Sequence, residues 1–196
     1  GMNHPPTQTL TAGGVSEIHR LLDDIESDIS VRVLVFTGAG EGVFIAHYEV
    51  GELSDSAQRN IETDSRTIAS DESEPEFSEM HQVCLRLEQI SAITIAAMNG
   101  TATGGGFELC LACDFRLLAE GRYRVGLPET SIGIIPGAGG TQRYARLLGT
   151  ANALDLILHA KLLTPAQALE KGLVHRTYPE ECFLDEVEAF SVDIAG

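Results

Sequence analysis

The sequence predicts an α/β fold built as a single domain, and two observations carry this prediction. Short β-branched runs, such as VRVLVFTG (31–38), alternate along the whole chain with segments whose apolar residues recur at helical spacing. The chain has 196 residues, 43% of them hydrophobic, which suits one compact core. We therefore expect one domain over residues 2–196, with Gly1 a remnant of a purification tag ahead of Met2.

The individual elements are predicted from periodicity and from turn residues. Thr164 marks one helix start clearly, because threonine caps a helix and the following Pro165 fits its first position. The predicted helices cover residues 15–29, 76–90, the segment that begins at the glycines 104–106, and then 137–149, 152–160, 164–172 and 181–195. The predicted strands cover residues 31–38, 43–46, 94–100, 114–120, 123–126 and 173–179.

Residues 54–76 form a polar, acidic segment with only scattered apolar positions. Their composition favours a solvated loop. A lid over a ligand site is the alternative interpretation.

The composition excludes several classes of partner. The formal net charge of −16 argues against binding to nucleic acid or to an anionic membrane surface. No apolar run approaches the roughly 20 residues that a membrane helix needs. Four cysteines do not make a disulfide framework, and no signal peptide is recognisable, so we expect a cytoplasmic protein.

Cys110 and Cys113 form a single C-x-x-C motif. A structural zinc site requires a second pair at matching spacing, and a redox pair requires its first cysteine at a helix start. Neither condition is met here, which favours two buried packing residues over metal or redox chemistry. No metal site is predicted.

The stretch GTATGGGFELCLACD (100–114) places three glycines at the start of an apolar helix. Glycine is a poor helix former, so bare backbone must be needed there. The pattern is neither a G-x-G-x-x-G fingerprint nor a P-loop, which lowers the prospect of a nucleotide phosphate site. It favours an N–H group at the helix start that faces a carbonyl oxygen which becomes negative during a reaction.

Two linked segments, IAAMNGTATGGGFELCLACD (95–114) and LPETSIGIIPGAGGTQR (127–143), resemble the enoyl-CoA hydratase/isomerase family, also called the crotonase family. The likeness runs from about Val31 to Tyr178 and is densest over 96–143. It implies a crotonase-like ββα superhelix and an acyl-CoA thioester as substrate. Coenzyme A would be part of that substrate, so the resemblance implies no separate cofactor.

The resemblance also implies an oxyanion hole of two backbone N–H groups for the thioester carbonyl. It puts one donor on Gly105 and the other on Ala46, in the segment FIAHYEV (44–50). His47 replaces the glycine usual in the family, and is either a new catalytic group or a polar surface residue. The residues that the resemblance assigns to substrate binding are Ala46, His47, Gly104, Gly105 and Gly137.

Glu108 and Glu129 occupy the positions of the two glutamates of the family's hydratases. By this resemblance Glu108 activates a water molecule and Glu129 supplies the proton to the α-carbon. Two acids in one desolvated site can divide such proton transfers when their pKa values are pulled apart. The alternative role for either acid is a carboxylate favoured by the dipole at a helix start. The glycines of GAGGTQR (137–143) are interpreted as a packing turn rather than a phosphate loop.

Compared with the family pattern, the chain lacks the usual first strands and most of the C-terminal helical region. The resemblance implies a homotrimer or a dimer of trimers. Three functions remain open: hydration of a 2-enoyl-CoA, another acyl-CoA isomerase or lyase reaction, and acyl-CoA binding without catalysis. Retention of both glutamates favours hydration, because an isomerase can work with one.

Overall fold

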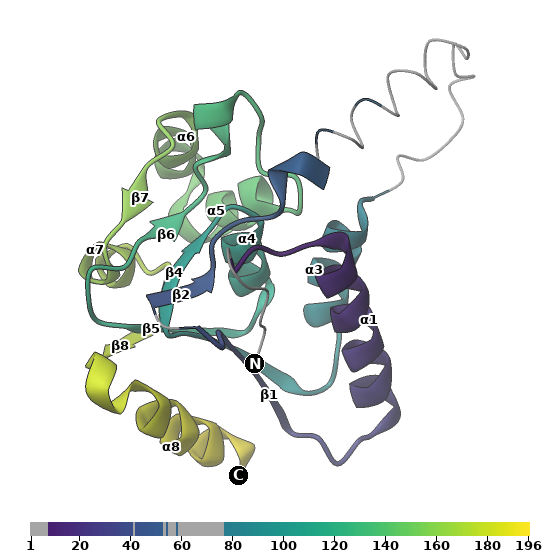
Figure 1. The fold of residues 1–196 in the computed structure, drawn as a ribbon. Helices are drawn as coiled ribbons and strands as arrows, with labels where there is room; N and C mark the ends of the chain where they lie inside the picture. The colour runs from purple at the N-terminus through teal and green to yellow at the C-terminus, as the bar shows by residue number, and fades with distance from the viewer. Residues whose placement is uncertain (1–7, 41, 53, 55–57, 59–76) are drawn as a thin grey trace.

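The computed structural model describes residues 8–40, 42–52, 54, 58 and 77–196 (Figure 1). The polar segment 54–76 therefore lies outside the described residues apart from Ser54 and Gln58, and its interpretation as loop or lid is not addressed.

The strands form two four-stranded sheets, with the orders β1-β3-β5-β8 and β2-β4-β6-β7. All pairs are parallel except β6 with β7. The first six strands alternate between the two sheets, so each of the pairs β1–β2, β3–β4 and β5–β6 places one strand in each sheet, which confirms the predicted ββα superhelix. The strands are β1 (Val33–Thr37), β2 (Gly42–Ile45), β3 (Ile93–Met98), β4 (Gly100–Thr103), β5 (Phe115–Ala119), β6 (Val125–Gly126), β7 (Leu162–Leu163) and β8 (Arg176–Tyr178).

The helices pack around these sheets, and α4 lies at the centre, in contact with α3, α5, β2, β3 and β4. Every residue of α4 is buried. No helix among the described residues is long and apolar enough to cross a membrane. The helices are α1 (Ala12–Ser27), α3 (Glu79–Leu87), α4 (Gly105–Ala112), α5 (Gly140–Leu148), α6 (Thr150–Leu158), α7 (Pro165–Glu170) and α8 (Phe183–Ala195), with the 3-10 helices η1 (Glu129–Ile132) and η2 (Glu180–Cys182).

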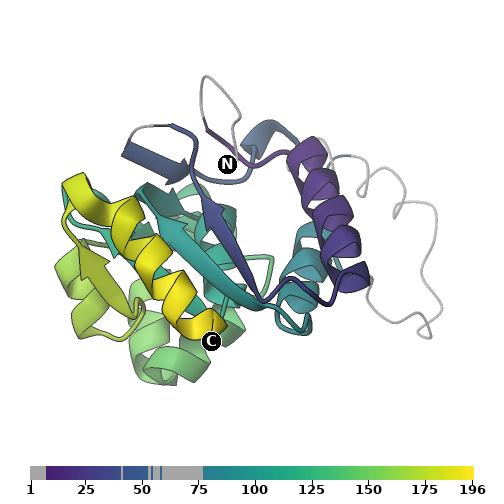
Figure 2. The same ribbon diagram turned by 90° about the horizontal axis from the view of Figure 1, so that it is seen from below.

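The helices divide into groups that cover different parts of the sheets. Helices α1 and α3 pack on each other, and α8 lies along β1 and β5 (Figure 2). Helix α8 packs Phe183 and Val187 against Ile95 and Leu117, and these residues form a separate core cluster. The main core, which includes α4, lies on the other side of the first sheet and supports the start of α4.

The main differences from the sequence prediction concern the first helix and three short strands. The first helix ends at Ser27 rather than continuing to Ile29, whose side chain is 90% exposed. Strand β4 was not predicted, because its Gly100 reads as a turn residue. A Cβ at Gly100 would lie 2.3 Å from the backbone of Gly42, so glycine permits close strand pairing there rather than a turn. The short strand β7 was also missed, and the strand predicted over 123–126 is reduced to β6.

Candidate active site

The start of α4 has a backbone that only glycine accommodates easily. Gly104 precedes the helix with φ of 53°, in the left-handed region that side chains disfavour. A Cβ at Gly106 would lie 2.6 Å from the Cβ of Ile45, and one at Gly105 would lie 3.1 Å from the Cβ of Tyr48. The chain from Ile45 to Tyr48 therefore passes directly against the helix start. The three glycines are explained by this close approach.

Ala46 lies in this crossing segment, but its backbone groups are already occupied. Its N–H donates to the carbonyl of Gln8 at 2.9 Å, and its carbonyl accepts a hydrogen bond from the hydroxyl of Thr103. The Ala46 N–H is therefore not available to a substrate oxygen in this structure. The resemblance-based assignment of this oxyanion donor to Ala46 does not fit the geometry.

Tyr48 has a backbone N–H that is not occupied in this way. The residue Tyr48 forms a parallel bridge with Leu10. In this bridge the Leu10 N–H donates to the His47 carbonyl at 2.9 Å, and the Leu10 carbonyl accepts from the Glu49 N–H at 2.8 Å. In a parallel bridge the residue between the two bonded residues, here Tyr48 between His47 and Glu49, points its N–H away from the paired segment. The Tyr48 nitrogen lies 3.7 Å from the point that a Cβ of Gly105 would occupy. Within the described part of the chain, neither the Tyr48 nor the Gly105 N–H donates a hydrogen bond.

Glu108 lies one helical turn beyond Gly105 and is only 3% exposed. Its Oε1 accepts two backbone hydrogen bonds, from the N–H groups of Ala138 and Gly140, each at 2.8 Å. Burial raises the pKa of the Glu108 carboxyl, while these amides and the charge of Arg143 act in the opposite direction. Glu108 is thus a buried acid whose ionised form is supported by oriented amides.

Glu129 begins η1 directly after Pro128. Both of its carboxylate oxygens are buried, and neither forms a hydrogen bond with another described residue. Burial raises the pKa of Glu129 to about 7, and the charge of Glu108 adds to this effect. Glu129 is therefore close enough to Glu108 to be influenced by its charge, yet has a very different set of partners.

Gly104 is the point where these groups converge. A Cβ there would lie 3.4 Å from Oε1 of Glu129 and 3.7 Å from the Cβ of His47. His47 is exposed, and its Nδ1 lies 2.6 Å from the Tyr48 carbonyl. The structure thus gathers two predicted glycines, both glutamates and His47 around one helix start.

Gly137 lies on the loop that leads into α5. Nothing lies within 4 Å of the position where its Cβ would be, so the residue borders open space. Its backbone interacts with both Glu108 and the ring of His81 on α3. His81 was not predicted as a site residue, since nothing in the sequence links α3 to this loop.

Tyr144 on α5 is a second residue that the sequence did not identify. It is fully buried, and its hydroxyl forms no hydrogen bond with any residue that the structure describes. Burial, together with the charge of Glu129, raises the pKa of this phenol. In the sequence Tyr144 is recognisable only as a tyrosine at a core position of an amphipathic helix.

The chain matches a known protein family over almost its whole length. A family model described as enoyl-CoA hydratase/isomerase matches residues 1–195. The chain belongs to the enoyl-CoA hydratase/isomerase family. The resemblance first noted in the glycine-rich segment therefore extends over almost the whole sequence.

Individual relatives of this family include hydratases and isomerases. A curated relative, the fatty acid oxidation complex subunit alpha of Shewanella amazonensis, is 36% identical over 96% of this chain but only 25% of its own length. The crystal structure of an enoyl-CoA hydratase from Bacillus anthracis has a TM-score of 0.84 and 32% identity, covering 98% of this chain and 70% of that one. Human mitochondrial delta3-delta2-enoyl-CoA isomerase has a TM-score of 0.80 and 27% identity, covering 98% and 70%.

The chain therefore spans about a quarter of the length of the curated relatives that it matches first. Because hydratases and an isomerase share this fold so closely, family membership alone does not select the reaction.

The two cysteines of the C-x-x-C motif lie at the far end of α4 and are buried. Each thiol faces a carbonyl of its own helix, Cys110 that of Gly106 at 3.2 Å and Cys113 that of Leu109 at 3.5 Å. Burial raises the pKa of the Cys113 thiol to about 12 and raises that of Cys110 as well. Both thiols therefore stay protonated and serve as small packing side chains.

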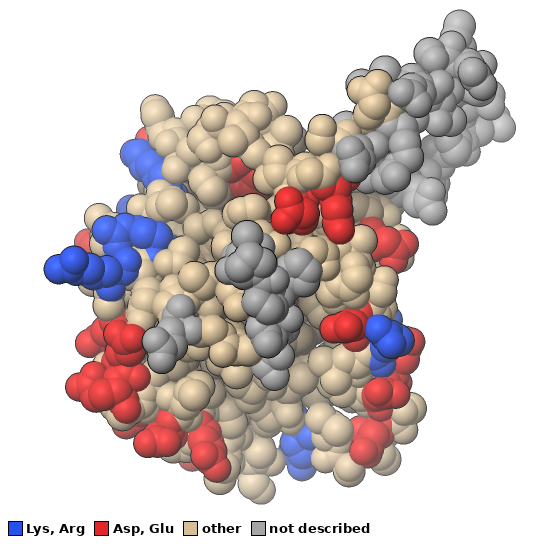
Figure 3. All heavy atoms as spheres, viewed as in Figure 1, with Lys and Arg blue, Asp and Glu red and all other residues tan. Residues whose placement is uncertain are grey.

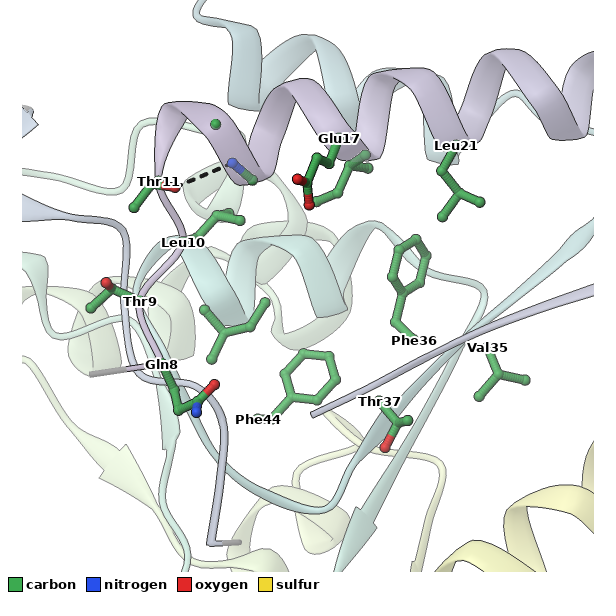
Figure 4. Close-up of a pocket in the computed structure, with 14 residues that line it drawn as sticks. Gln8, Thr9, Leu10, Thr11, Glu17, Leu21, Val35, Phe36, Thr37 and Phe44 are labelled. Carbon is green, nitrogen blue, oxygen red and sulfur yellow. Dashed lines mark hydrogen bonds between the residues drawn. The ribbon is translucent and has the colours of Figure 1, made fainter. Parts of the chain in front are cut away.

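A separate cavity of about 560 Å³ lies between α1, β1 and β2 (Figure 4). Leu10, Leu21, Phe36 and Phe44 supply much of its apolar lining, and neither Glu108 nor Glu129 reaches it. Among the described residues that line this cavity Glu17 is the single acid, so no pair of acids like Glu108 and Glu129 is present there.

Proposed function

We propose that this chain adds water to the double bond of a 2-enoyl-CoA thioester. The observation that carries the proposal is the pairing of two acids with buried carboxylate oxygens, Glu108 and Glu129, beside two backbone N–H groups that donate to no described residue. Hydration of a conjugated thioester requires a base for the water, an acid for the α-carbon and stabilisation of an enolate-like oxygen. Each of these three requirements has a candidate group at the start of α4.

We assign the oxyanion hole to the N–H groups of Gly105 and Tyr48. Gly105 supplies the first N–H of α4, where the helix dipole also favours negative charge. Tyr48 replaces Ala46 in this role, because the Ala46 N–H is bound to Gln8. Both donors are backbone groups held in place before the substrate arrives, and preorganised donors stabilise developing charge most effectively.

In this mechanism Glu108 is the base and Glu129 the acid. Glu108 takes a proton from water, whose oxygen forms a bond to the β-carbon. The electrons of the double bond move toward the carbonyl, and its oxygen is stabilised by the Gly105 and Tyr48 N–H groups. Glu129 then donates its proton to the α-carbon, which restores the thioester. The different surroundings of the two acids support this division, since two amides of other residues donate to Glu108 and favour its ionised form, whereas no other described residue donates to Glu129.

Substrate contacts are proposed for the remaining residues of the site. Gly104 borders Glu129 and has no side chain to fill the space between that acid and His47. Gly137 borders open space on the loop that binds Glu108. The exposed His47 is suited to contact a polar part of the thioester. An acyl-CoA substrate agrees with the family, and a place in fatty acid metabolism follows by analogy with the relatives' names.

The test is hydration of crotonyl-CoA, followed by the loss of its enoyl absorbance. We expect Glu108→Gln and Glu129→Gln each to lower kcat by roughly 10²–10⁴, because each removes one positioned proton-transfer group. The double variant should be little worse than the poorer single variant, since both acids serve one transition state. Glu170→Gln, an exposed change on α7, is the matched control and should leave kcat unchanged.

Hydration that survives unchanged in folded Glu108→Gln and Glu129→Gln proteins would rule out the proposed mechanism. Binding of the thioester should persist in both variants, because backbone donors rather than carboxylates hold its carbonyl. Calorimetric titration with a saturated acyl-CoA separates loss of binding from loss of turnover.

Migration of a double bond is the second candidate reaction. It is favoured by the state of Glu129, whose two oxygens bind no described residue, whereas one oxygen of Glu108 accepts hydrogen bonds from two amides. A single mobile acid is enough to move a proton between two carbons. If a 3-enoyl-CoA is isomerised and only Glu129→Gln impairs this reaction, isomerisation replaces hydration as the function.

A further inference from the structure

The loop that binds Glu108 has an anchor of its own. The guanidinium of Arg143 donates from Nη1 to the carbonyl of Ala138 at 2.7 Å and from Nε to Oε1 of Glu88 at 2.9 Å. The Arg143 side chain is only 6% exposed, whereas that of Glu88 is 35% exposed. An internal arginine thus links the end of α3 to the loop ahead of α5.

We propose that Arg143 and Glu88 are a positioning pair for Glu108, which hold the 137–140 loop so that its amides point at one carboxylate oxygen. The inference rests on the proposed role of Glu108 as the base. Neither Arg143 nor Glu88 is assigned a contact with substrate.

Ala138 is the residue through which this pair would act. Its carbonyl accepts from Arg143, while its N–H donates to Oε1 of Glu108 at 2.8 Å. The Gly140 N–H donates to the same oxygen, so both amide bonds depend on the orientation of one short loop. The Ala138 carbonyl and the Ala138 N–H belong to adjacent peptide groups, so the charge-assisted bond that fixes the carbonyl also restricts the orientation of the N–H.

The sequence of the loop is adapted to the arginine. Gly139 has φ of 94°, and a Cβ there would lie 2.1 Å from Nη1 of Arg143. The guanidinium therefore occupies space that exists only because residue 139 has no side chain. Burial of a charged arginine is costly unless it is paired and hydrogen-bonded, and the Glu88 carboxylate and the Ala138 carbonyl accept two of its hydrogen bonds.

The charge of Arg143 has a further consequence for Glu108. Burial alone would favour the neutral acid, and the positive charge is one of the influences that lower the pKa of Glu108 toward the ionised form. Arg143 therefore combines two effects on the base, one geometric and one electrostatic. The two effects are separable, because lysine keeps the charge but not the planar fork of donors.

Three variants test the pair: Arg143→Met, Arg143→Lys and Glu88→Gln. Arg86→Met is the matched control, because Arg86 on α3 also forms ion pairs between two elements, but with Asp23 and Glu26 on α1. We expect Arg143→Met to lower kcat for crotonyl-CoA hydration about 10- to 100-fold, as misplaced catalytic groups do, with little change in KM. Arg86→Met should retain the wild-type kcat.

The pH profile distinguishes a positioning role from general damage. In Arg143→Met the low-pH limb of kcat/KM should move to higher pH, because the charge that favours ionised Glu108 is gone. Arg143→Lys should lower kcat less and leave this limb in place. Glu88→Gln should also lower kcat without moving the limb upward, because the arginine charge remains.

Amide hydrogen exchange supplies a readout that needs no activity. The Ala138 and Gly140 amides should exchange faster in all three variants than in the wild type, while the amides of α6 stay unchanged. If the wild type hydrates no enoyl-CoA, the proposed function fails, and the exchange rates still decide whether the pair holds the loop. If Arg143→Met does not fold, Arg143→Lys and Glu88→Gln decide the question. Folded variants with wild-type kcat and wild-type exchange at Ala138 and Gly140 would overturn the proposal.

Discussion

Glu108 and Glu129 are both withdrawn from water, but the two carboxyl groups have opposite surroundings. Glu108 has two amide donors on one oxygen and a nearby guanidinium charge. Glu129 has no donor from another described residue and lies near a second acid. Amides and a positive charge favour the carboxylate, whereas burial and a neighbouring negative charge favour the neutral acid. Burial raises the pKa of both carboxyls, and the amides and the guanidinium oppose this effect at Glu108, so the two groups are not equivalent, in line with the proposed division into base and acid.

The pKa of Glu129 predicts the pH dependence of hydration. This pKa is raised from 4.5 to about 7, so the group carries its proton below pH 7 and loses it above. As a proton donor it should make kcat/KM for crotonyl-CoA fall as the pH rises through about 7. A rate profile of the wild type between pH 5 and 9, at roughly unit intervals, checks this sign. A rise through the same range would mean that Glu129 acts as a base and would contradict the assigned roles.

The stability of the fold offers a control that does not depend on substrate. A carboxyl whose folded pKa is raised binds more protons in the folded state between pH 4.5 and about 7. The free energy of unfolding should therefore fall as the pH rises through this window. Denaturant titrations at its two ends should show a smaller fall in Glu129→Gln, which cannot lose a proton.

The site residues were predictable from the sequence to different extents. Both glutamates and Gly105 lie in two dense motifs, so their positions follow directly from the resemblance. The choice between Ala46 and Tyr48 as oxyanion donor did not follow from the resemblance. It depends on which backbone N–H groups the pairing with Gln8 and Leu10 leaves without a partner among the described residues. These partners lie far away in the sequence, and no local pattern records the pairing.

The segment that follows β2 crosses the start of α4, and this crossing creates the proposed oxyanion hole. Proline at Tyr48 removes the N–H that faces Gly105, while Tyr48→Ala keeps it. We expect Tyr48→Pro to lower kcat for hydration by roughly 10²–10³, the usual cost of one lost oxyanion donor. Tyr48→Ala, the matched control, should retain most of the activity, as measured by crotonyl-CoA hydration.

A folded Tyr48→Pro protein with wild-type kcat would remove Tyr48 from the oxyanion hole. Folding must be verified by circular dichroism, because proline also restricts the preceding residue, His47. If Tyr48→Ala is as impaired as Tyr48→Pro, the side chain rather than the N–H carries the effect.

Most helices and strands were predicted, and those that were missed share a physical cause. Helix α7 has a complete capping box at Thr164 and Gln167, which is a local signal that can be recognised in the sequence. Strands β4 and β7 have no such signal. Strand β4 begins at Gly100, which closes against the backbone of Gly42, and β7 has only two residues that pair with β6. Both depend on partners that are distant in the chain, and strand formation is decided by such pairing.

The charge of the whole molecule restricts how it would meet the proposed substrate, an anionic thioester. The face shown in Figure 3 carries acidic side chains along its lower left and right sides, while basic side chains gather mainly at its left edge. With a net charge of −16, long-range attraction does not draw a CoA derivative to the protein. Backbone donors at the start of α4 therefore have particular importance, because they act on the thioester only at short range.

Exposed apolar side chains predict that the chain associates with itself. Ile132 and Ile135, in and after η1, are 58% and 69% exposed, and Leu154 and Leu158 on α6 are 51% and 64% exposed. The hydroxyl of Thr130 binds a carbonyl of α6, so these side chains lie on connected elements. Exposed apolar side chains on adjacent elements mark interaction sites in many proteins when they form one patch.

We therefore expect oligomers, with the trimer implied by the family as the first candidate, in sedimentation velocity at tens of micromolar protein. Replacing Leu154 and Leu158 together by Glu should shift the population toward monomer, because charged groups would have to lose water on association. Val192→Glu, at a residue of α8 that is 69% exposed, is the matched control and should leave the distribution unchanged. A wild-type protein that sediments as a single monomeric species would show that these side chains do not bind a second copy.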